Sequence, residues 1–466
     1  MLFLLVLLYV IPLFLIAVYK IVVKGKWEWV IFFFILYLPF YITILSIVYQ
    51  STGSVLLVNV FQYLKELMLL LAGISWLVYQ RNVFEYTFRI QLIDKLFLAF
   101  YLLCFVFLIA PIGSADFITK AIYFKNVLIM GLLYFFGRNT TLKDGEYRNL
   151  FLILIFLFIA AFGVNIFETL IQTHSQNLTG YALYNSVINN TEPSGNYGLT
   201  WSFETQTTGM RLASFFSNPL ELASSCLLGF SVGLIGYLTS KREQSWVFIL
   251  MMLATIGSLF FAASRASFAS FFIQLSFIAI IFRLYGLIKI GIALFVSLVS
   301  YIIFFASDEL YYFVIDTLTF ENASSLGHVV AWFEALDQMI VAPLGSGLAT
   351  SGNASTVMDE LRIGGENQFL IFGVQLGVLG MLLYTAILAT GIWTAVKAFK
   401  IADNTHLARI AFIGATTKVG LLLPLFTANA ELYAFVSWIS WWMIGLSVKT
   451  YISCSFNQNS IVESNS

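Results

Sequence analysis

Long apolar runs, repeated along nearly the whole chain of 466 residues, limit its fold more than any other feature. A helix that crosses a membrane needs about 20 mostly apolar residues, and soluble domains do not carry such runs in series. Stretches of this kind are separated by polar connections that are short, apart from two long ones. The predicted spans are 2–19, 27–49, 55–79, 93–112, 117–136, 149–170, 219–240, 245–262, 266–285, 287–305, 367–390, 409–427 and 432–448.

The composition excludes several classes of protein. Charged residues make up only 10% of the chain, against about 25% in soluble domains. Twenty-four basic and 24 acidic residues leave no net charge, which argues against a nucleic-acid partner. Three cysteines and three histidines, without metal-ligand spacing, exclude a disulfide scaffold and a zinc ribbon. We predict an all-α polytopic membrane bundle of about 12–13 spans over 1–450, followed by a disordered cytoplasmic tail at 451–466.

Basic residues predict the orientation, because they collect in cytoplasmic connections. Seventeen of the 24 lie in alternate connections, four fall inside predicted spans, and the other connections hold only Arg211, Arg265 and Arg362. This pattern places the N-terminus outside and the C-terminus inside. The three isolated arginines then lie on the outer face.

Both long connections, 171–218 and 306–365, also fall on the outer side, where long loops on a rigid scaffold tend to carry function. Within the second, 325–342 has helical periodicity. Its apolar residues share one face, and His328, Glu334 and Asp337 share another. We expect this helix to lie on the outer leaflet or to cap the bundle.

Two outer arginines are candidates for binding an anion. Arg211 precedes the turn and helix start at Asn218-Pro219, and a guanidinium at this level grips a phosphate with two hydrogen bonds. The alternative is an interfacial arginine paired with Glu204 or Glu221. Arg265 occupies the tight turn 264–267, where it is either paired with an anion or directed to lipid headgroups.

Glu366 begins the span at 367–390, after two glycines. It is a candidate general base, because burial and a neighbouring pyrophosphate would both raise its pKa from about 4.3. The alternative is a carboxylate that stabilises the helix dipole. Lys120 and Lys125 lie in the outer half of their span and are candidates for lining an anionic cavity or for packed, paired residues. Lys418, near mid-depth, requires a partner or a cavity.

Four outer blocks occur in order along 211–380. They are RLASFFSNP from Arg211, SRAS from Ser264, AWFEAL and APLGSG from Ala331 to Gly347, and ENQFLIFGVQLGVLG from Glu366. Together they resemble the O-antigen polymerase and O-antigen ligase superfamily, bacterial membrane glycosyltransferases that use glycans linked to undecaprenyl pyrophosphate. The range that they span, 211–380, is a little over a third of the chain. One departure is that the ligase pattern has His-Asn where this chain has Glu366-Asn367, which favours a polymerase.

The resemblance implies a GT-C-like enzyme of the bacterial inner membrane, with its active site on the outer face, that polymerises the repeat units of an O-antigen or exopolysaccharide. Its partners would be glycans linked to polyprenyl pyrophosphate, membrane lipid and a chain-length regulator protein, with neither metal nor cofactor. The expected catalytic residues are Glu366, Arg211 and Arg265. The expected substrate-binding residues are Lys120, Lys125, Asn218, Asn367 and His328.

Three alternatives remain open from the sequence. A ligase would move the finished glycan to another acceptor. A flippase or other transporter would depend on charges near the midplane, such as Lys65, Glu66 and Lys418, and not on the outer arginines. A non-enzymatic membrane partner would tolerate substitution of all these residues.

Overall fold

The computed structural model describes residues 1–80, 89–205, 209–305, 311, 315, 319, 323–352 and 362–464. Over these ranges the chain is helical, and the β pairing there is limited to two isolated bridges, Ser194↔Leu199 and Glu204↔Met210. Eleven helical segments are long and apolar enough to cross a membrane. The predicted all-α polytopic bundle is confirmed.

All thirteen predicted spans form helices, some of them from two or more consecutive elements. The α-helices are α1 (Leu2–Val18), α2 (Val30–Tyr37), α3 (Tyr41–Thr52), α4 (Val55–Tyr79), α5 (Leu92–Ile109), α6 (Phe117–Asn139), α7 (Asp144–Ile171), α8 (Ser175–Thr179), α9 (Tyr181–Ile188), α10 (Pro219–Thr239), α11 (Ser245–Ala262), α12 (Arg265–Ile281), α13 (Gly286–Phe304), α15 (Ala323–Val341), α16 (Gln368–Ile401), α17 (Thr405–Gly420), α18 (Leu422–Thr427) and α19 (Ala434–Ser464).

Two expectations need correction. The eleven spanning segments do not include α12, which has only 17 residues, or α19, whose tryptophans and Lys449 reduce its apolar character. The tail 451–466, predicted to be disordered, is helical as far as Ser464. Its polar composition predicts disorder, but in the structure it continues the hydrogen-bond ladder of a well-packed helix, and extending an existing helix costs far less than starting one.

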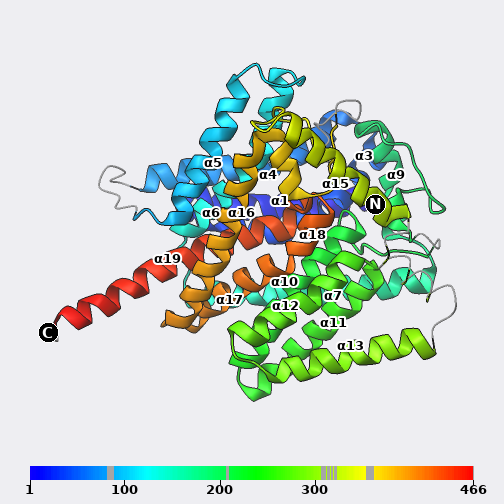
Figure 1. Cartoon of the computed structure of the whole chain (residues 1–466). Coiled ribbons are helices and arrows are strands. Elements are labelled where there is room, and N and C mark those ends of the chain that lie inside the picture. The colour runs from blue at the N-terminus through cyan, green and yellow to red at the C-terminus, as the bar shows by residue number, and fades with distance from the viewer. Residues whose placement is uncertain are drawn as a thin grey trace.

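The bundle centre depends on glycines that let helices approach closely. A Cβ on Gly137 of α6 would lie 2.0 Å from the carbonyl oxygen of Trp442 in α19, and a Cβ on Gly445 would lie 2.0 Å from that of Tyr134. The two helices therefore cross with their backbones in contact, as small residues permit in membranes. At the other extreme, α13 runs along the edge of the bundle and has no buried residue (Figure 1).

Contacts between connections agree with the predicted alternation of sides. Lys26 pairs with Glu146 at 2.6 Å, and Arg409 donates to Thr239 at 2.7 Å. All four residues belong to helix ends that the basic pattern places on one side. At the opposite ends, the described residues 171–205 and 209–218 form α8, α9 and loop segments that pack against α3 and the end of α11. This second end of the bundle holds the predicted site residues.

Candidate functional site

Arg211 is positioned by backbone hydrogen bonds that tie its loop to the end of α11. Its N–H donates to the carbonyl of Phe203 at 2.9 Å, and the N–H of Leu212 donates to the carbonyl of Phe261 at 3.0 Å. The guanidinium Nε donates to the carbonyl of Ala262 at 3.1 Å. Arg211 is therefore held, half-buried, against the turn between α11 and α12.

Arg265 follows in that same turn. Ala263 has a left-handed backbone (φ 47°), and Ser264 caps α12 by accepting a hydrogen bond from the N–H of Ser267. These residues place Arg265 at the first position of α12, also half-buried. Burial, followed by the charge of Arg265, lowers the pKa of Arg211 to about 10. Both guanidinium groups stay charged at neutral pH, so an anion that contacts both would relieve their repulsion.

The predicted alternative partners of Arg211 are engaged elsewhere. The Glu221 carboxylate accepts from the N–H of Phe435 at 3.3 Å, and that of Glu204 accepts from the N–H of Asn196 at 2.8 Å. Among the described residues neither forms an ion pair with Arg211. The structure thus leaves the positive charge of Arg211 unneutralised by these two carboxylates.

The two glycines before Glu366 set the path of the chain that positions its side chain. Gly364 and Gly365 have φ values of 60° and 132°, which favour glycine. A Cβ on Gly364 would lie 2.9 Å from the carbonyl oxygen of Ala331, so the chain runs tightly along α15. The Glu366 carboxylate then meets His328 of α15, whose Nδ1 pairs with Oε2. This carboxylate–imidazole pair is partly exposed and open to a ligand.

Tyr433, between α18 and α19, connects these groups. Burial raises the pKa of its phenol, and the charges of Glu221, Arg211 and Glu366 act on that pKa in turn. Sequence reasoning missed Tyr433, because a tyrosine at a membrane boundary is usually an interfacial anchor. The structure thus brings Arg211, Arg265, Glu366 and His328 to the same end of the bundle.

Two of the predicted substrate-binding residues are helix caps. Asn218 Oδ1 accepts from the N–H of Glu221 at 2.9 Å at the start of α10. Asn367 Oδ1 accepts from the N–H groups of Phe369 and Leu370 at 3.0 and 3.2 Å at the start of α16. These bonds explain both asparagines as local structure, since an N-cap side chain pairs otherwise unsatisfied N–H groups.

The two lysines of α6 lie away from the arginines and have protein partners. Lys120 Nζ donates to the carbonyls of Ala110 and Ile112, at 3.2 and 2.6 Å. Lys125 Nζ pairs with Glu66 of α4 at 3.0 Å. Lys125 is thus paired with Glu66, while its side chain stays 43% exposed.

The predicted helix at 325–342 is α15 (Ala323–Val341), which packs on α16. Ala335 and Met339 are buried against α16, whereas Phe333, Leu336 and Ile340 are exposed, the last at 78%. An exposed apolar stripe of this kind fits a helix that lies at the membrane surface.

The segment after α15 enters the bundle at a break in α16, which sequence reasoning did not predict. Gly377 has φ 74°, so α16 is interrupted about 14 Å from its start. The freed carbonyls of Val374 and Gln375 accept from the N–H groups of Ser346 and Gly347 at 2.7 and 3.1 Å. Non-helical backbone at membrane depth occurs where it is buried in protein or lines a cavity. The motif from Pro343 to Gly347 thus completes a broken helix.

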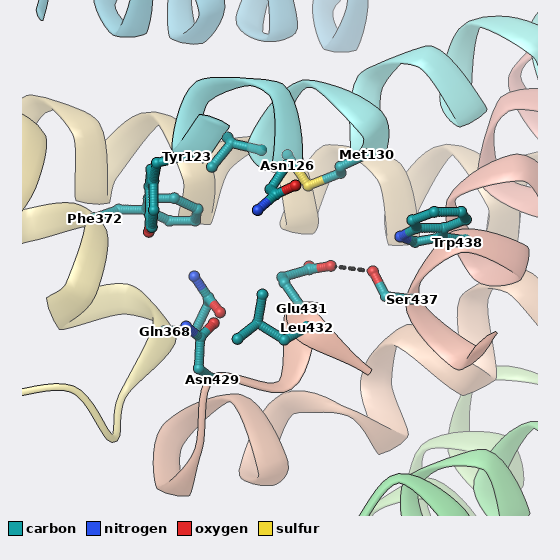
Figure 2. Close-up of a pocket in the computed structure, with 11 residues that line it drawn as sticks. Tyr123, Asn126, Met130, Gln368, Phe372, Asn429, Glu431, Leu432, Ser437 and Trp438 are labelled. Atoms are coloured by element: carbon teal, nitrogen blue, oxygen red, sulfur yellow. Dashed lines mark hydrogen bonds between the residues drawn. The ribbon is translucent and has the colours of Figure 1, made fainter. Parts of the chain in front are cut away.

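A small cavity of about 40 Å³ lies between α6, the start of α16 and the segment that joins α18 to α19 (Figure 2). Its acidic residue is Glu431, which the sequence analysis did not single out. The Glu431 carboxylate accepts from Tyr384 at 2.6 Å and from the indole of Trp441 at 3.2 Å, and Lys418 lies 3.7 Å away. The partner that mid-depth Lys418 requires is therefore Glu431. Residues 429–433 separate this cavity from the arginines.

The arrangement provides charges of both signs next to lipid. Two guanidinium groups suit a phosphate, and a carboxylate paired with an imidazole suits proton transfer. Among the described residues, no group of three His, Cys, Asp or Glu side chains is placed to hold a metal ion. Comparison with models of protein families and with curated proteins finds no match to this chain.

Proposed function

We propose that this protein is a membrane glycosyltransferase that polymerises polysaccharide repeat units carried on polyprenyl pyrophosphate. One observation carries the proposal: Arg211 is hydrogen-bonded to the turn that carries Arg265, at the same end of the bundle as the Glu366–His328 pair. An anion-binding pair and a base at the boundary of a membrane bundle fit a substrate with a charged head, a sugar and a lipid tail. The motifs at 211–219, 264–267 and 366–380 support the same proposal through their resemblance to polymerases.

The proposed reaction is a single displacement. Arg211 and Arg265 bind the pyrophosphate of the donor and stabilise the charge that develops on the leaving group. Glu366, oriented by His328, takes the proton from the acceptor hydroxyl. The hydroxyl oxygen forms the new bond to the anomeric carbon while the bond to the pyrophosphate breaks. Polyprenyl pyrophosphate leaves, and the anomeric configuration inverts.

A surface groove between α12 and α13 supports a lipid-linked substrate. It is lined almost entirely by apolar side chains, among them Phe268, Phe272 and Phe295. Phe268 lies one turn below Arg265, so the groove starts next to the proposed pyrophosphate site. A polyprenyl tail would be accommodated there without leaving the bilayer. The proposal includes the bacterial inner membrane, an outer-facing site and a chain-length regulator as partner.

The test is polymerisation by the purified full chain in nanodiscs, given lipid-linked repeat units and read as a ladder on a gel. Arg265→Ala and Glu366→Gln should each lower the rate of polymerisation at least about 100-fold, since each removes a group that acts on the transition state. The ladder should then contain only short products. Arg242→Ala and Glu243→Gln are the matched controls, because both residues are exposed at the opposite end of the bundle. Their ladders should equal that of the wild type.

Long ladders from well-expressed Arg265→Ala and Glu366→Gln would refute the assignment. A single product on a different acceptor, with no growth of short units, would indicate a ligase. Movement of lipid-linked units across the membrane without any new glycosidic bond would indicate a transporter.

A further inference from the structure

We propose that the cavity beside Glu431 is a binding site for a cluster of ordered water molecules, next to the buried Lys418–Glu431 ion pair. The cavity measures about 40 Å³. One buried water needs about 10–15 Å³ of such a space, so the cavity has room for about three. The inference concerns the bundle itself and does not depend on the proposed function.

The lining offers hydrogen bonds from three parts of the chain. Asn126 of α6, Gln368 of α16 and Asn429 meet around the same space (Figure 2). An amide both donates and accepts hydrogen bonds, as water does. The rings of Phe372 and Trp438 form other parts of the wall. A buried water needs two to four polar partners, and this lining supplies them.

Gln368 presents an acceptor to the cavity. Its side chain is 2% exposed, and its Oε1 accepts no hydrogen bond from any of the described residues. Figure 2 shows this side chain pointing into the cavity, towards Asn429. A buried carbonyl oxygen without a donor costs free energy, so such groups are normally paired with protein or with ordered water.

Tyr123 presents a donor to the same cavity. Its hydroxyl oxygen accepts from Nε2 of Gln375 at 2.7 Å, so its own proton is free to be donated elsewhere. Within the part of the chain that the structure describes, that proton has no protein acceptor. Water can accept from Tyr123 and donate to Gln368, whereas a cation could serve only the carbonyl oxygen.

Other occupants fit the cavity less well. A sugar ring or a lipid chain is larger than the space, and the Glu431 carboxylate would repel a phosphate. A cation has little to neutralise, because that carboxylate accepts from Tyr384 at 2.6 Å and from the indole of Trp441 at 3.2 Å. Lys418 balances its charge at 3.7 Å. A small, neutral molecule that both donates and accepts remains.

Water at this position has a physical consequence for the bundle. Polar groups inside a membrane protein have no bulk solvent to pair with, so buried water supplies the partners. A hydrated cavity beside Glu431 also lowers the cost of keeping two charges within the bundle. The cluster would join α6, the start of α16 and the segment before α19 through hydrogen bonds that no direct contact provides.

The test is X-ray radiolytic footprinting of the full chain in nanodiscs, in which a bound water becomes a hydroxyl radical and oxidises the side chain that it touches. Met130 lines the cavity and is only 5% exposed. It should be oxidised at least about tenfold faster than Met251, which is buried in α11 away from the cavity. This comparison needs no variant, so it does not depend on the folding of a mutant.

Two variants then locate the water. Gln368→Leu removes a hydrogen-bond partner, and Val127→Leu adds a methylene to the wall, so each should lower the rate at Met130 by at least about threefold. The matched controls are Gln50→Leu and Val60→Leu, because both residues are exposed, in α3 and α4. Their rates at Met130 should equal that of the wild type.

Three results would overturn the inference, whether or not a polymerisation ladder appears. Equal oxidation of Met130 and Met251 would show a dry cavity. An unchanged rate at Met130 in both Gln368→Leu and Val127→Leu would place the water elsewhere. A melting temperature that rises when sodium or potassium chloride replaces choline chloride, in the wild type but not in Gln368→Leu, would show a cation site instead.

Discussion

The ion pair between Lys418 and Glu431 makes the most quantitative prediction about this bundle. The Lys418 side chain is 1% exposed, and its Nζ lies 3.7 Å from Glu431 Oε1 and 3.9 Å from the centre of the Trp441 ring. At an effective dielectric constant of about 20, two unit charges at this distance attract by about 4 kcal/mol. Removing one member of such a pair leaves the other charge buried without compensation, at a cost of about 3–5 kcal/mol.

The two single substitutions should differ, because the two partners are not equally supported. Lys418→Met leaves the Glu431 carboxylate with the hydroxyls of Tyr384 and Ser437 and the indole of Trp441. Glu431→Gln leaves the ammonium over the Trp441 ring alone, among its described contacts, and a desolvated cation–π contact contributes only about 2 kcal/mol. We therefore expect about 4 kcal/mol of destabilisation from Glu431→Gln and about 2 kcal/mol from Lys418→Met.

The assay is a double-mutant cycle on the free energy of unfolding, measured by far-UV circular dichroism as SDS is titrated into dodecyl maltoside micelles. The double variant should be at least about 2 kcal/mol more stable than the sum of the single effects predicts, because no charge is left uncompensated. Additive effects, or a Glu431→Gln protein as stable as the wild type, would show that the pair is not coupled and would refute the reasoning.

Two further predictions concern backbone and pH. Gly377→Ala should lower the free energy of unfolding by about 3 kcal/mol, because residue 377 has φ 74° and a Cβ there would lie 2.5 Å from the carbonyl oxygen of Pro343. The control is Gly73→Ala in α4, where a Cβ meets nothing within 4 Å. Equal melting temperatures for the two variants would contradict the prediction. Burial between aromatic rings lowers the pKa of His174 to about 4. Between about pH 6.5 and pH 4 the unfolded chain therefore binds a proton at this histidine that the folded chain does not. As the pH falls through this window, the protein should lose up to about 3 kcal/mol of stability. His174→Phe should flatten the dependence of the melting temperature on pH, and an unchanged slope would rule out this origin.

Much of the bundle could be predicted because its signals are local. Apolar length identified each of the thirteen helices, and the distribution of basic residues assigned Lys26, Glu146, Arg409 and Thr239 to connections whose contacts agree. The helix start at Asn218 could also be predicted, since capping depends on a few neighbouring residues. The prediction of disorder at 451–464 was wrong, because the composition of the tail does not show which helix it extends.

The candidate site divides in the same way. Arg211 and Arg265 could be found because basic residues are rare in the connections that the sequence predicts to lie outside, and Glu366 because it directly precedes a predicted span. Glu431, Gln368 and Tyr433 could not be found, because each is an ordinary residue near a helix end until its neighbours are known. The paired state of Lys120 and Lys125 likewise depends on groups supplied by other segments, such as Glu66.

The amino-acid sequence by itself therefore determined the membrane-spanning architecture, the predicted alternation of sides and the arginines that mark one end of the bundle. These properties depend on how single segments partition between water and lipid, which is an energy summed along the chain. Only the tertiary structure decided that α16 breaks at Gly377, that residues 343–347 satisfy the break, and that three amides converge on a cavity beside Glu431. Those features arise from packing and hydrogen bonding between segments that are distant in the sequence, and no local pattern of residues predicts which segments pair.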